Sequence, residues 1–338
     1  MAKAARRSPA MRVLVVTSQW PSPDTPSAGI FVAGQVASLR RLGVDVDVFS
    51  YRGAKRPLNY WRARAAVRRS LRRGGYDLAH ICWGQNGLLA LPTDLPLVVS
   101  LLGTDLFGAV GRTGRHGVLS LFLPRVSRFV ARRADAVVVP TRRLRAELPA
   151  SLAVAVIPFG IDDARFRPMA QTQAQRELGL DAGRQYVLFG ADPSRPVKRF
   201  DLARATVDRL GDSDVTLLTL GGVPPTQVPL FLNACDALLI TSSHEGGPII
   251  AREVLACNVP VVSTDVGDVS EWVAGLEACR VCKDATPEAL AEGLRVAMAS
   301  RASFTGGREA VAPVFGDEPT RQLVALYRGV LAKKRSDR

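Results

Sequence analysis

The chain alternates between short apolar runs and longer segments in which apolar residues recur every three to four positions. Apolar runs of about four to seven residues are typical of strands that are buried on both faces of a parallel sheet. The recurring pattern is typical of helices that cover such a sheet. The apolar runs predict strands at 12–17, 44–50, 77–82, 97–102, 135–139 and 153–157, and again at 185–190, 215–220, 236–240, 260–263 and 278–282.

The segments between these strands carry the helical pattern. It predicts helices at 29–42, 58–73, 117–133, 141–148, 198–210, 225–234, 248–257, 268–274, 287–299 and 318–334. Because strands and helices alternate along the chain, we predict an α/β fold with parallel, doubly wound sheets.

One turn-rich segment, residues 158–184, interrupts the alternation. The chain has 338 residues, which is more than one hydrophobic core usually supports. We therefore predict two Rossmann-like domains, over residues 1–165 and 166–316, followed by a helix and a basic tail over 317–338. Ligands of such folds bind at the carboxyl ends of the strands, so we expect the site in a central crevice between the domains.

The formal net charge of +14 predicts an anionic partner, which is a nucleic acid, an acidic membrane or a phosphorylated substrate. Residues 52–73 carry nine basic and no acidic side chains, and 61–73 form a basic amphipathic helix. A second basic amphipathic run covers 118–133. Both runs are explained equally well as ordinary surface helices and as a docking face for anionic lipid. Aromatic residues are few and do not alternate with the basic ones, so no nucleic acid is expected.

No apolar run reaches the roughly 18 residues that a spanning helix needs, and the first ten residues lack the apolar core of a signal peptide. We expect a cytoplasmic protein, which the basic helices could hold as a peripheral protein on the inner face of the cell membrane. The five cysteines have no disulfide-framework spacing, and Cys279-x-x-Cys282 is a lone pair. Asp45-Val-Asp47 lies inside a predicted strand rather than at a strand end. We therefore expect neither a metal nor a cofactor.

The most informative stretch is 240–267, which predicts a buried strand, a Gly-Gly-Pro loop, a helix and a second buried strand. Glu245 precedes the loop, and Glu253 follows it about one helical turn later, with seven residues between the two. Pro248 suits the first helical position, where its missing N–H costs nothing. The backbone amides that would then face an anion are those of Gly247, Ile249 and Ile250. A phosphate on these amides, with carboxylates for hydroxyl groups on either side, is the arrangement that a nucleotide-sugar requires.

Other candidates lie at predicted strand ends. Arg195 and Lys198 follow the strand at 185–190, where positive charge can neutralise a diphosphate leaving group; the alternative is a solvated basic loop. Asp105 either binds a hydroxyl group or caps its own loop. Gly29 begins the helix after the first strand, where it could touch a phosphate, although this signal is weak by itself.

These motifs resemble the retaining glycosyltransferases of family 4, which have the GT-B fold. The signature is Glu245-x7-Glu253, and Leu102-Gly-Thr-Asp stands where many members have His-Gly-x-Asp. The segment that begins Val156-Ile-Pro-Phe-Gly-Ile-Asp is similar to the family's inter-domain passage. The subgroup of teichuronic-acid and capsular-polysaccharide biosynthesis is the most similar, through His244-Glu-Gly-Gly-Pro and the Ala-Cys-Asn-Val-Pro that follows.

The resemblance implies an N-terminal acceptor domain, a C-terminal nucleotide-sugar donor domain and a final helix that packs back on the first domain. It implies that Glu253 binds the ribose, that Glu245 binds the transferred sugar and that Lys198, with Arg195, stabilises the leaving nucleotide. The diphosphate would lie on the amides of Gly246, Gly247 and Ile249. In this family the departing phosphate oxygen can take the acceptor's proton on the same face, so no protein nucleophile and no metal are needed.

The predicted activity is therefore transfer of a hexose from a nucleotide-diphosphate sugar to a lipid-linked or oligosaccharide acceptor in cell-surface polysaccharide biosynthesis. Two departures from the family pattern motivate an alternative, a non-catalytic nucleotide-sugar binder: Leu102 replaces a histidine, and Ala191 stands where many members have a phosphate-binding arginine. A nucleic-acid binder is a second alternative that charge alone motivates.

Overall fold

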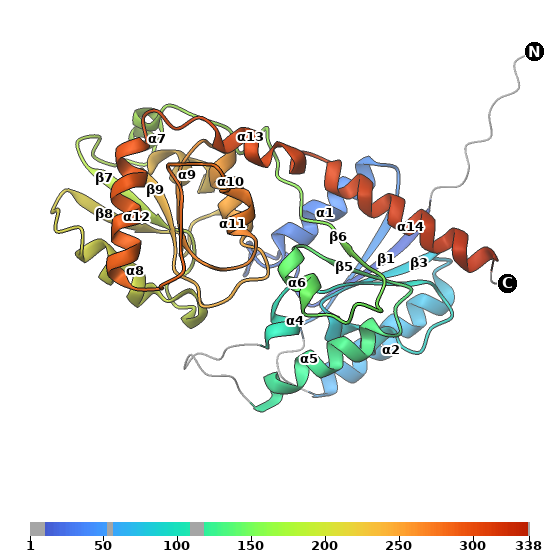
Figure 1. Ribbon diagram of the computed structural model, residues 1–338. Helices are drawn as coiled ribbons and strands as arrows, with labels where there is room; N and C mark the ends of the chain where they lie inside the picture. The colour runs from blue at the N-terminus through green and yellow to red at the C-terminus, as the bar shows by residue number, and fades with distance from the viewer. Residues whose placement is uncertain (1–10, 53–56, 109–117, 337–338) are drawn as a thin grey trace, which may run out of the picture.

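The computed structural model describes residues 11–52, 57–108 and 118–336, which form two parallel sheets with helices on both faces (Figure 1). The first sheet has the order β2-β1-β3-β4-β5-β6 and the second has the order β11-β10-β9-β7-β8. All the strand pairs that join neighbours in these two sheets are parallel. The α/β, doubly wound fold class predicted from the alternating pattern is confirmed.

The first sheet contains the first six predicted strands. Its strands are β1 (Arg12–Thr17), β2 (Asp45–Ser50), β3 (Leu78–Cys82), β4 (Leu97–Ser100), β5 (Ala136–Val139) and β6 (Val154–Val156). Its helices are α1 (Ile30–Arg41), α2 (Pro57–Arg73), η1 (Gly84–Asn86), α3 (Gly87–Ala90), α4 (Thr104–Phe107), α5 (Val118–Ala131) and α6 (Arg142–Ala146). One apolar core lies between the sheet and α2 and α5, and another lies on the opposite face under α1.

The second sheet contains the remaining five predicted strands. Its strands are β7 (Gln185–Phe189), β8 (Val215–Thr219), β9 (Ala237–Ile240), β10 (Val261–Thr264) and β11 (Arg280–Cys282). The helices and 3-10 turns of this half are α7 (Gln171–Glu177), η2 (Pro196–Lys198), α8 (Phe200–Asp208), η3 (Pro225–Gln227), α9 (Val228–Ala234), α10 (Ile249–Ala256), α11 (Val269–Trp272), α12 (Pro287–Ser300), α13 (Gly307–Val311) and η4 (Ala312–Val314). Helices α9 and α10 cover one face and α8 and α12 cover the other, each over its own core.

Helix α14 (Glu318–Ser336) returns to the first sheet, where it lies beside α1 (Figure 1). Tyr327 of α14 is fully buried there, and its hydroxyl lies 2.5 Å from Nδ1 of His80 in β3. Ser38 of α1 donates a hydrogen bond of 2.6 Å to Asp317, which precedes α14. The predicted crossing of the final helix to the first domain is therefore confirmed, while the domain limits at 165 and 316 stay predictions.

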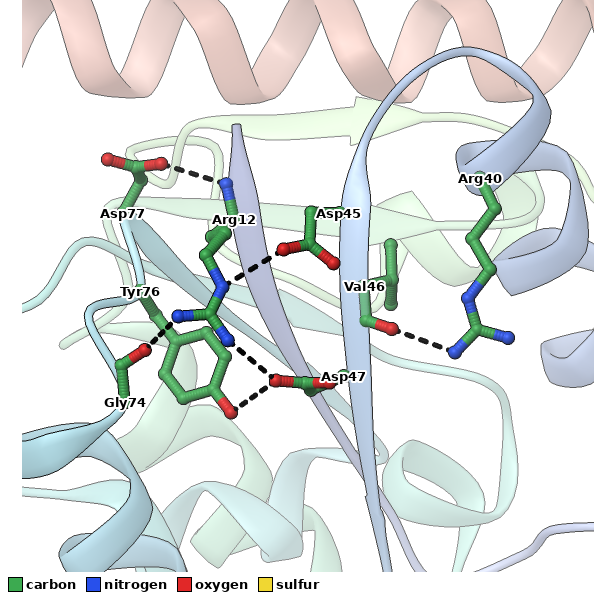
Figure 2. Close-up of polar contacts among 8 residues, drawn as sticks. All are labelled: Arg12, Arg40, Asp45, Val46, Asp47, Gly74, Tyr76 and Asp77. Carbon is green, nitrogen blue, oxygen red and sulfur yellow. Dashed lines mark hydrogen bonds and ion pairs between the residues drawn. The ribbon is translucent and has the colours of Figure 1, made fainter. Parts of the chain in front are cut away.

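The Asp-x-Asp pair at the start of β2 is held by one arginine (Figure 2). Arg12 of β1 lies 3.0 Å from Asp45 Oδ2 through Nε and 3.1 Å from Asp47 Oδ2 through Nη2. The Tyr76 hydroxyl donates to the same oxygen of Asp47 at 2.7 Å, and burial together with Asp47 raises the pKa of Tyr76 to about 12. These carboxylates lie at the amino ends of the strands and stabilise the pairing of β1 with β2.

The elements differ from the predicted ones mainly in short pieces. Each strand begins and ends within two residues of its prediction. The sequence did not predict the short helices α3, α4 and α13, which have too few residues to show a helical period. Along the described ranges of the chain, no helix combines the length and apolar character required to cross a bilayer.

Candidate active site

The loop that follows β9 is tied to the loop that follows β7. The hydroxyl of Thr241 donates to the backbone oxygen of Lys198 at 2.7 Å, and the amide of Ser243 donates to the oxygen of Val197 at 2.9 Å. Both loops leave the carboxyl ends of neighbouring strands, as the pairing of β7 with β9 requires. The two candidate segments of the sequence, 195–198 and 245–253, therefore lie side by side.

Lys198 and Glu245 form an ion pair at this junction. The Lys198 ammonium group contacts Glu245 Oε1, and the Ser242 hydroxyl donates to the same oxygen at 2.6 Å. The two side chains are only 13% and 16% exposed. A partly buried pair with a third hydrogen bond is more strongly oriented than a surface pair, so the ammonium group is fixed at the loop that was predicted to hold a phosphate.

Gly246 and Gly247 pack directly against the first domain. A β carbon on Gly246 would lie 2.3 Å from the oxygen of Leu102, and one on Gly247 would lie 2.7 Å from Cγ2 of Thr141. Thr141 also donates to the Gly246 oxygen at 3.1 Å. Gly247 has φ 144°, which side chains disfavour. Glycine is therefore required at both positions by close approach, and the loop bridges the two sheets.

Helix α10 begins one residue later than predicted, at Ile249. Pro248 has ψ 103° and is the N-cap residue rather than the first helical one, which corrects the sequence prediction. Its carbonyl accepts the first hydrogen bond of the turn, from Ala251 at 3.0 Å. The amides of Ile249 and Ile250 precede that bond, so they remain at the helix N-terminus, where an anion is favoured.

Glu253 is a partly buried carboxyl group in the second turn of α10. Burial raises the pKa of Glu253 to about 7, and the positive charges of Arg165 and Arg252 oppose this rise. The carboxyl group of Glu253 therefore loses its proton at a higher pH than an ordinary glutamate does. A carboxyl group of this kind, about one turn from a helix N-terminus and within the field of two arginines, is suited to accept hydrogen bonds from hydroxyl groups when it is ionised.

Asp105 holds a loop instead of facing a ligand. Its side chain is fully buried, and its oxygens accept hydrogen bonds from the amides of Gly84 at 3.0 Å, Leu102 at 2.9 Å and Gly103 at 2.8 Å. Burial raises the pKa of Asp105, and these backbone bonds lower it. Of the two predicted roles, the capping role is the one in the structure, and we revise its catalytic assignment to that of a residue that fixes the turn against Gly246.

Two other predicted residues, Gly29 and Arg195, are not part of the Lys198–Glu245 ion pair. Gly29 is the N-cap of α1 with φ 63°, and a β carbon there would lie 2.3 Å from the Gln19 oxygen. Glycine is therefore required for the turn itself, whether or not a phosphate binds. Arg195 is exposed, and it adds only a small part to the lowering of the Asp192 pKa, which comes first from the Ser194 amide. The structure brings Lys198, but not Arg195, to Glu245.

The two histidines of the described ranges, His80 and His244, and the four buried cysteines are part of the packing. His80 is buried between Ser100, at 2.7 Å from Nε2, and Tyr327, and burial lowers its pKa to about 4. His244 lies against the ring of Phe107, with centroids 5.9 Å apart. Cys279 is buried, and burial raises the pKa of its thiol to about 11. Within the described ranges, no group of three or more His, Cys, Asp and Glu residues could hold a metal ion.

The sequence analysis missed three residues of this region: Thr141 and Asp268, which border the Gly246–Gly247 loop, and Arg252, which precedes Glu253 in α10. Arg252 is fully buried and Asp268 is 4% exposed. The signal for Arg252 was present, because an arginine next to Glu253 interrupts the otherwise apolar helix Ile-Ile-Ala-Arg-Glu-Val-Leu-Ala. Thr141 had no such signal, since its contact with Gly246 joins residues 105 positions apart.

Comparison with known proteins adds matches in both halves of the chain. Residues 2–165 match the family described as Glycosyltransferase Family 4, and residues 213–305 match the family described as Glycosyl transferases group 1. The putative teichuronic acid biosynthesis glycosyltransferase TuaC of Bacillus subtilis (strain 168) is 25% identical, over 84% of this chain and 88% of TuaC. The lipopolysaccharide core biosynthesis mannosyltransferase LpsB of Rhizobium meliloti (strain 1021) is 31% identical, over 44% of this chain and 50% of LpsB.

Solved structures show the same fold at lower identity. Sucrose-phosphate synthase from Thermosynechococcus elongatus superposes with a TM-score of 0.76 at 18% identity, over 96% of this chain and 100% of that one. Anabaena Alr3699/HepE in complex with UDP and glucose superposes with a TM-score of 0.68 at 18% identity, over 94% and 99% of the two chains. The two family matches and the similarity to TuaC, together with the fold, show that the chain belongs to the GT-B glycosyltransferases. A family 4 domain is followed by a glycosyl transferases group 1 domain.

Proposed function

We propose that this glycosyltransferase moves a hexose from a nucleotide-diphosphate sugar to a lipid-linked or growing glycan acceptor in cell-surface polysaccharide biosynthesis. The observation that carries the proposal is the ion pair of Lys198 with Glu245 at the loop that leads into α10. The similarity to TuaC, named for teichuronic acid biosynthesis, and to LpsB, named a mannosyltransferase of lipopolysaccharide core biosynthesis, supports the acceptor class. A neighbour in the fold comparison, HepE, was solved with UDP and glucose.

The proposed roles follow from the chemistry of each group. The diphosphate lies on the amides of Gly246, Gly247 and Ile249, and Lys198 neutralises the charge that develops on the leaving phosphate. Glu245, which Lys198 orients, accepts hydrogen bonds from the transferred sugar. Ionised Glu253 accepts them from the ribose. The phosphate oxygen takes the acceptor's proton on the face it leaves, so configuration is retained and no metal is required.

A panel of UDP-, GDP-, ADP- and dTDP-sugars in a thermal-shift experiment tests donor binding, because a ligand that binds only the folded state raises Tm by mass action. We expect one nucleotide class to raise Tm, and Glu253→Ala to abolish that shift and to reduce transfer by about 100-fold or more. Glu292→Ala is the control, since Glu292 is an exposed residue of α12 paired with Arg295. Undiminished transfer by Glu253→Ala would refute the assignment.

A non-catalytic nucleotide-sugar binder is the second candidate, which Leu102 and Ala191 motivate. The carbonyl of Leu102 lies against Gly246, so residue 102 borders the donor loop whatever its side chain does. This candidate predicts a thermal shift with a nucleotide-sugar but neither transfer nor hydrolysis. Release of nucleoside diphosphate in the presence of any glycan acceptor eliminates it.

The proposal also places the first domain on an anionic membrane, through a surface that we call the α2–α5 face. Helix α3 contacts both α2 and α5, and the large exposed apolar residues there are Leu58, Tyr60, Trp61, Leu88, Phe122 and Phe129. A depression of 340 Å³ on α2 is lined by Ala65 and by Arg68, Arg69, Arg72 and Arg73. Exposed aromatic residues beside arginines are the composition of helices that lie in a membrane interface.

Sedimentation with vesicles tests the α2–α5 face. We expect binding to phosphatidylglycerol vesicles, little binding to phosphatidylcholine vesicles, and release by salt, because each basic residue near an anionic surface contributes about 1 kcal/mol. The double variant Trp61→Ala/Arg69→Ala should bind several-fold more weakly. Arg328→Ala on α14 is the control for a lost surface charge. Equal binding to both lipids would contradict the docking role.

A further inference from the structure

Arg252 is a fully buried arginine in α10, next in sequence to Glu253. Its Nη1 donates to the carbonyl oxygen of Phe159 at 3.2 Å, whereas Nε and Nη2 have no hydrogen-bond partner. A buried guanidinium group without a full set of acceptors is costly, since its desolvation outweighs a single hydrogen bond. Because the other buried residues of α10 are apolar, an arginine among them points to a use for its charge.

Burial lowers the pKa of Arg252, and the negative charge of Asp268, the N-cap residue of α11, opposes this together with that of Glu253. Trp272 lies between Arg252 and Asp268, with its Nε1 donating to Asp268 Oδ2 at 2.6 Å and its ring centroid 5.6 Å from Arg252 Cζ. The second oxygen, Asp268 Oδ1, is buried and has no partner. That oxygen lies 3.3 Å from the place that a β carbon on Gly247 would occupy. Asp268 is thus packed directly behind the predicted diphosphate loop, and Arg252 contacts the Trp272 ring that Asp268 holds.

Arg252 also links α10 to the first domain. Its acceptor, Phe159, belongs to the passage between the two sheets, and the Phe159 ring packs edge-on against Phe31 of α1 at a centroid distance of 4.8 Å. Gly29 precedes that helix as its N-cap. The contacts of one side chain therefore connect the helix that carries Glu253 to the helix that begins at Gly29.

We propose that Arg252, with Asp268 as its counter-ion, is a positioning residue of the donor site that ties the Glu253 helix to the inter-domain passage and holds the Gly246–Gly247 loop in its binding shape. The inference rests on the proposed nucleotide-sugar function and deepens it. Arg252 acts through Glu253 and the loop, and does not itself touch the nucleotide.

Because Arg252 is charged, this role predicts a specific pH dependence of nucleotide binding. The charged and titratable groups that act on Glu253 are Arg165, Arg252 and the thiol of Cys257. Ribose hydroxyl groups donate to a carboxylate, so nucleotide binding needs ionised Glu253 and weakens as the pH falls through its pKa of about 7. Loss of the Arg252 charge raises the pKa of Glu253 further, which moves the loss of binding to higher pH.

Calorimetric titration of the full chain with UDP, GDP, ADP and dTDP between about pH 6 and 9 tests the proposal. For the nucleotide that the wild type binds, Arg252→Met should raise Kd at pH 7 by about tenfold and shift the pH inflection upward by about one unit. Arg252→Lys keeps the charge and should keep the inflection. Asp268→Asn should weaken binding at every pH without an upward shift.

Arg301→Met is the matched control, because the Arg301 side chain also donates to backbone carbonyls, those of Asn233, Cys235 and Asn258. It should lower Tm and leave the inflection unchanged. The proposal is overturned if Arg252→Met has the Kd and the pH inflection of the wild type. It is also overturned if Arg301→Met raises Kd and shifts the inflection as Arg252→Met does. If Arg252→Met does not fold, unchanged Kd values in both Arg252→Lys and Asp268→Asn overturn it. A wild type that binds none of the four nucleotides overturns the proposed function as well, so the two failures are distinguishable.

Discussion

Two clusters of charge in this protein are built in opposite ways. Around Arg12, at the amino ends of β1 and β2, the guanidinium group is shared among Asp45, Asp47 and the Gly74 carbonyl, and the side chains of the two ion pairs are 41% to 53% exposed (Figure 2). Around Arg252 the charges are buried, and several of their polar atoms have no partner.

The difference follows from what lies beside each cluster. The Arg12 cluster joins strands and borders solvent, so its charges can be fully paired at little desolvation cost. The Arg252 cluster lies behind the loop that leads into α10, and the proposed ligand would contact that loop rather than Arg252. Sites that bind ligands are where local rules of pairing are most often broken. Substitutions in the two clusters should therefore separate loss of stability from loss of activity.

The largest effect is expected at Lys198, the cation of the donor loop. Lys198→Ala should lower kcat by about 100- to 1,000-fold, because it removes the charge that stabilises the leaving phosphate. Steady-state transfer assays with the donor identified by thermal shift measure this. Lys334→Ala is the control, since Lys334 is an exposed lysine paired with Asp135 at 3.2 Å. A kcat within twofold of the wild type would show that Lys198 has only a structural role.

A smaller effect is expected where the donor loop meets the first domain. Gly246→Ala places a β carbon 2.3 Å from the Leu102 oxygen, so the loop must move, and we expect KM for the donor to rise by about tenfold or more. Gly34→Ala, in α1 with no atom within 4 Å of the new β carbon, is the matched control and should leave KM unchanged. Equal KM values for both variants would mean that the loop tolerates displacement.

The smallest effect on activity is expected at the paired cluster. Arg12→Met removes two exposed ion pairs and should lower the free energy of unfolding by about 1 kcal/mol while kcat and KM stay unchanged. Urea unfolding followed by circular dichroism measures the first quantity, and the transfer assay measures the second. A large fall in activity at unchanged stability would reverse the contrast between the two clusters.

Much of the fold was predictable because strands and helices each have a characteristic spacing of apolar residues along the sequence. Runs such as Arg12–Thr17 are apolar on both faces, which fixed the strands, and their alternation with helices fixed the α/β class. The Glu245-x7-Glu253 spacing with Gly-Gly-Pro was equally local, so the donor loop was located before its neighbours were known. The start of α10 was missed by one residue because a proline suits both the N-cap and the first turn.

The sequence by itself determined the elements, their order and the stretch that carries the chemistry, because each depends on residues close together in the chain. Only the tertiary structure decided which partners that stretch has. Lys198 rather than Arg195 forms the ion pair with Glu245. The Asp105 carboxylate accepts hydrogen bonds from backbone amides, and Thr141, from the other sheet, donates one to Gly246. Arg252 and Asp268 carry opposite charges and several unpaired polar atoms, and they are 16 positions apart in the chain. They approach each other only when α10 and α11 pack around Trp272.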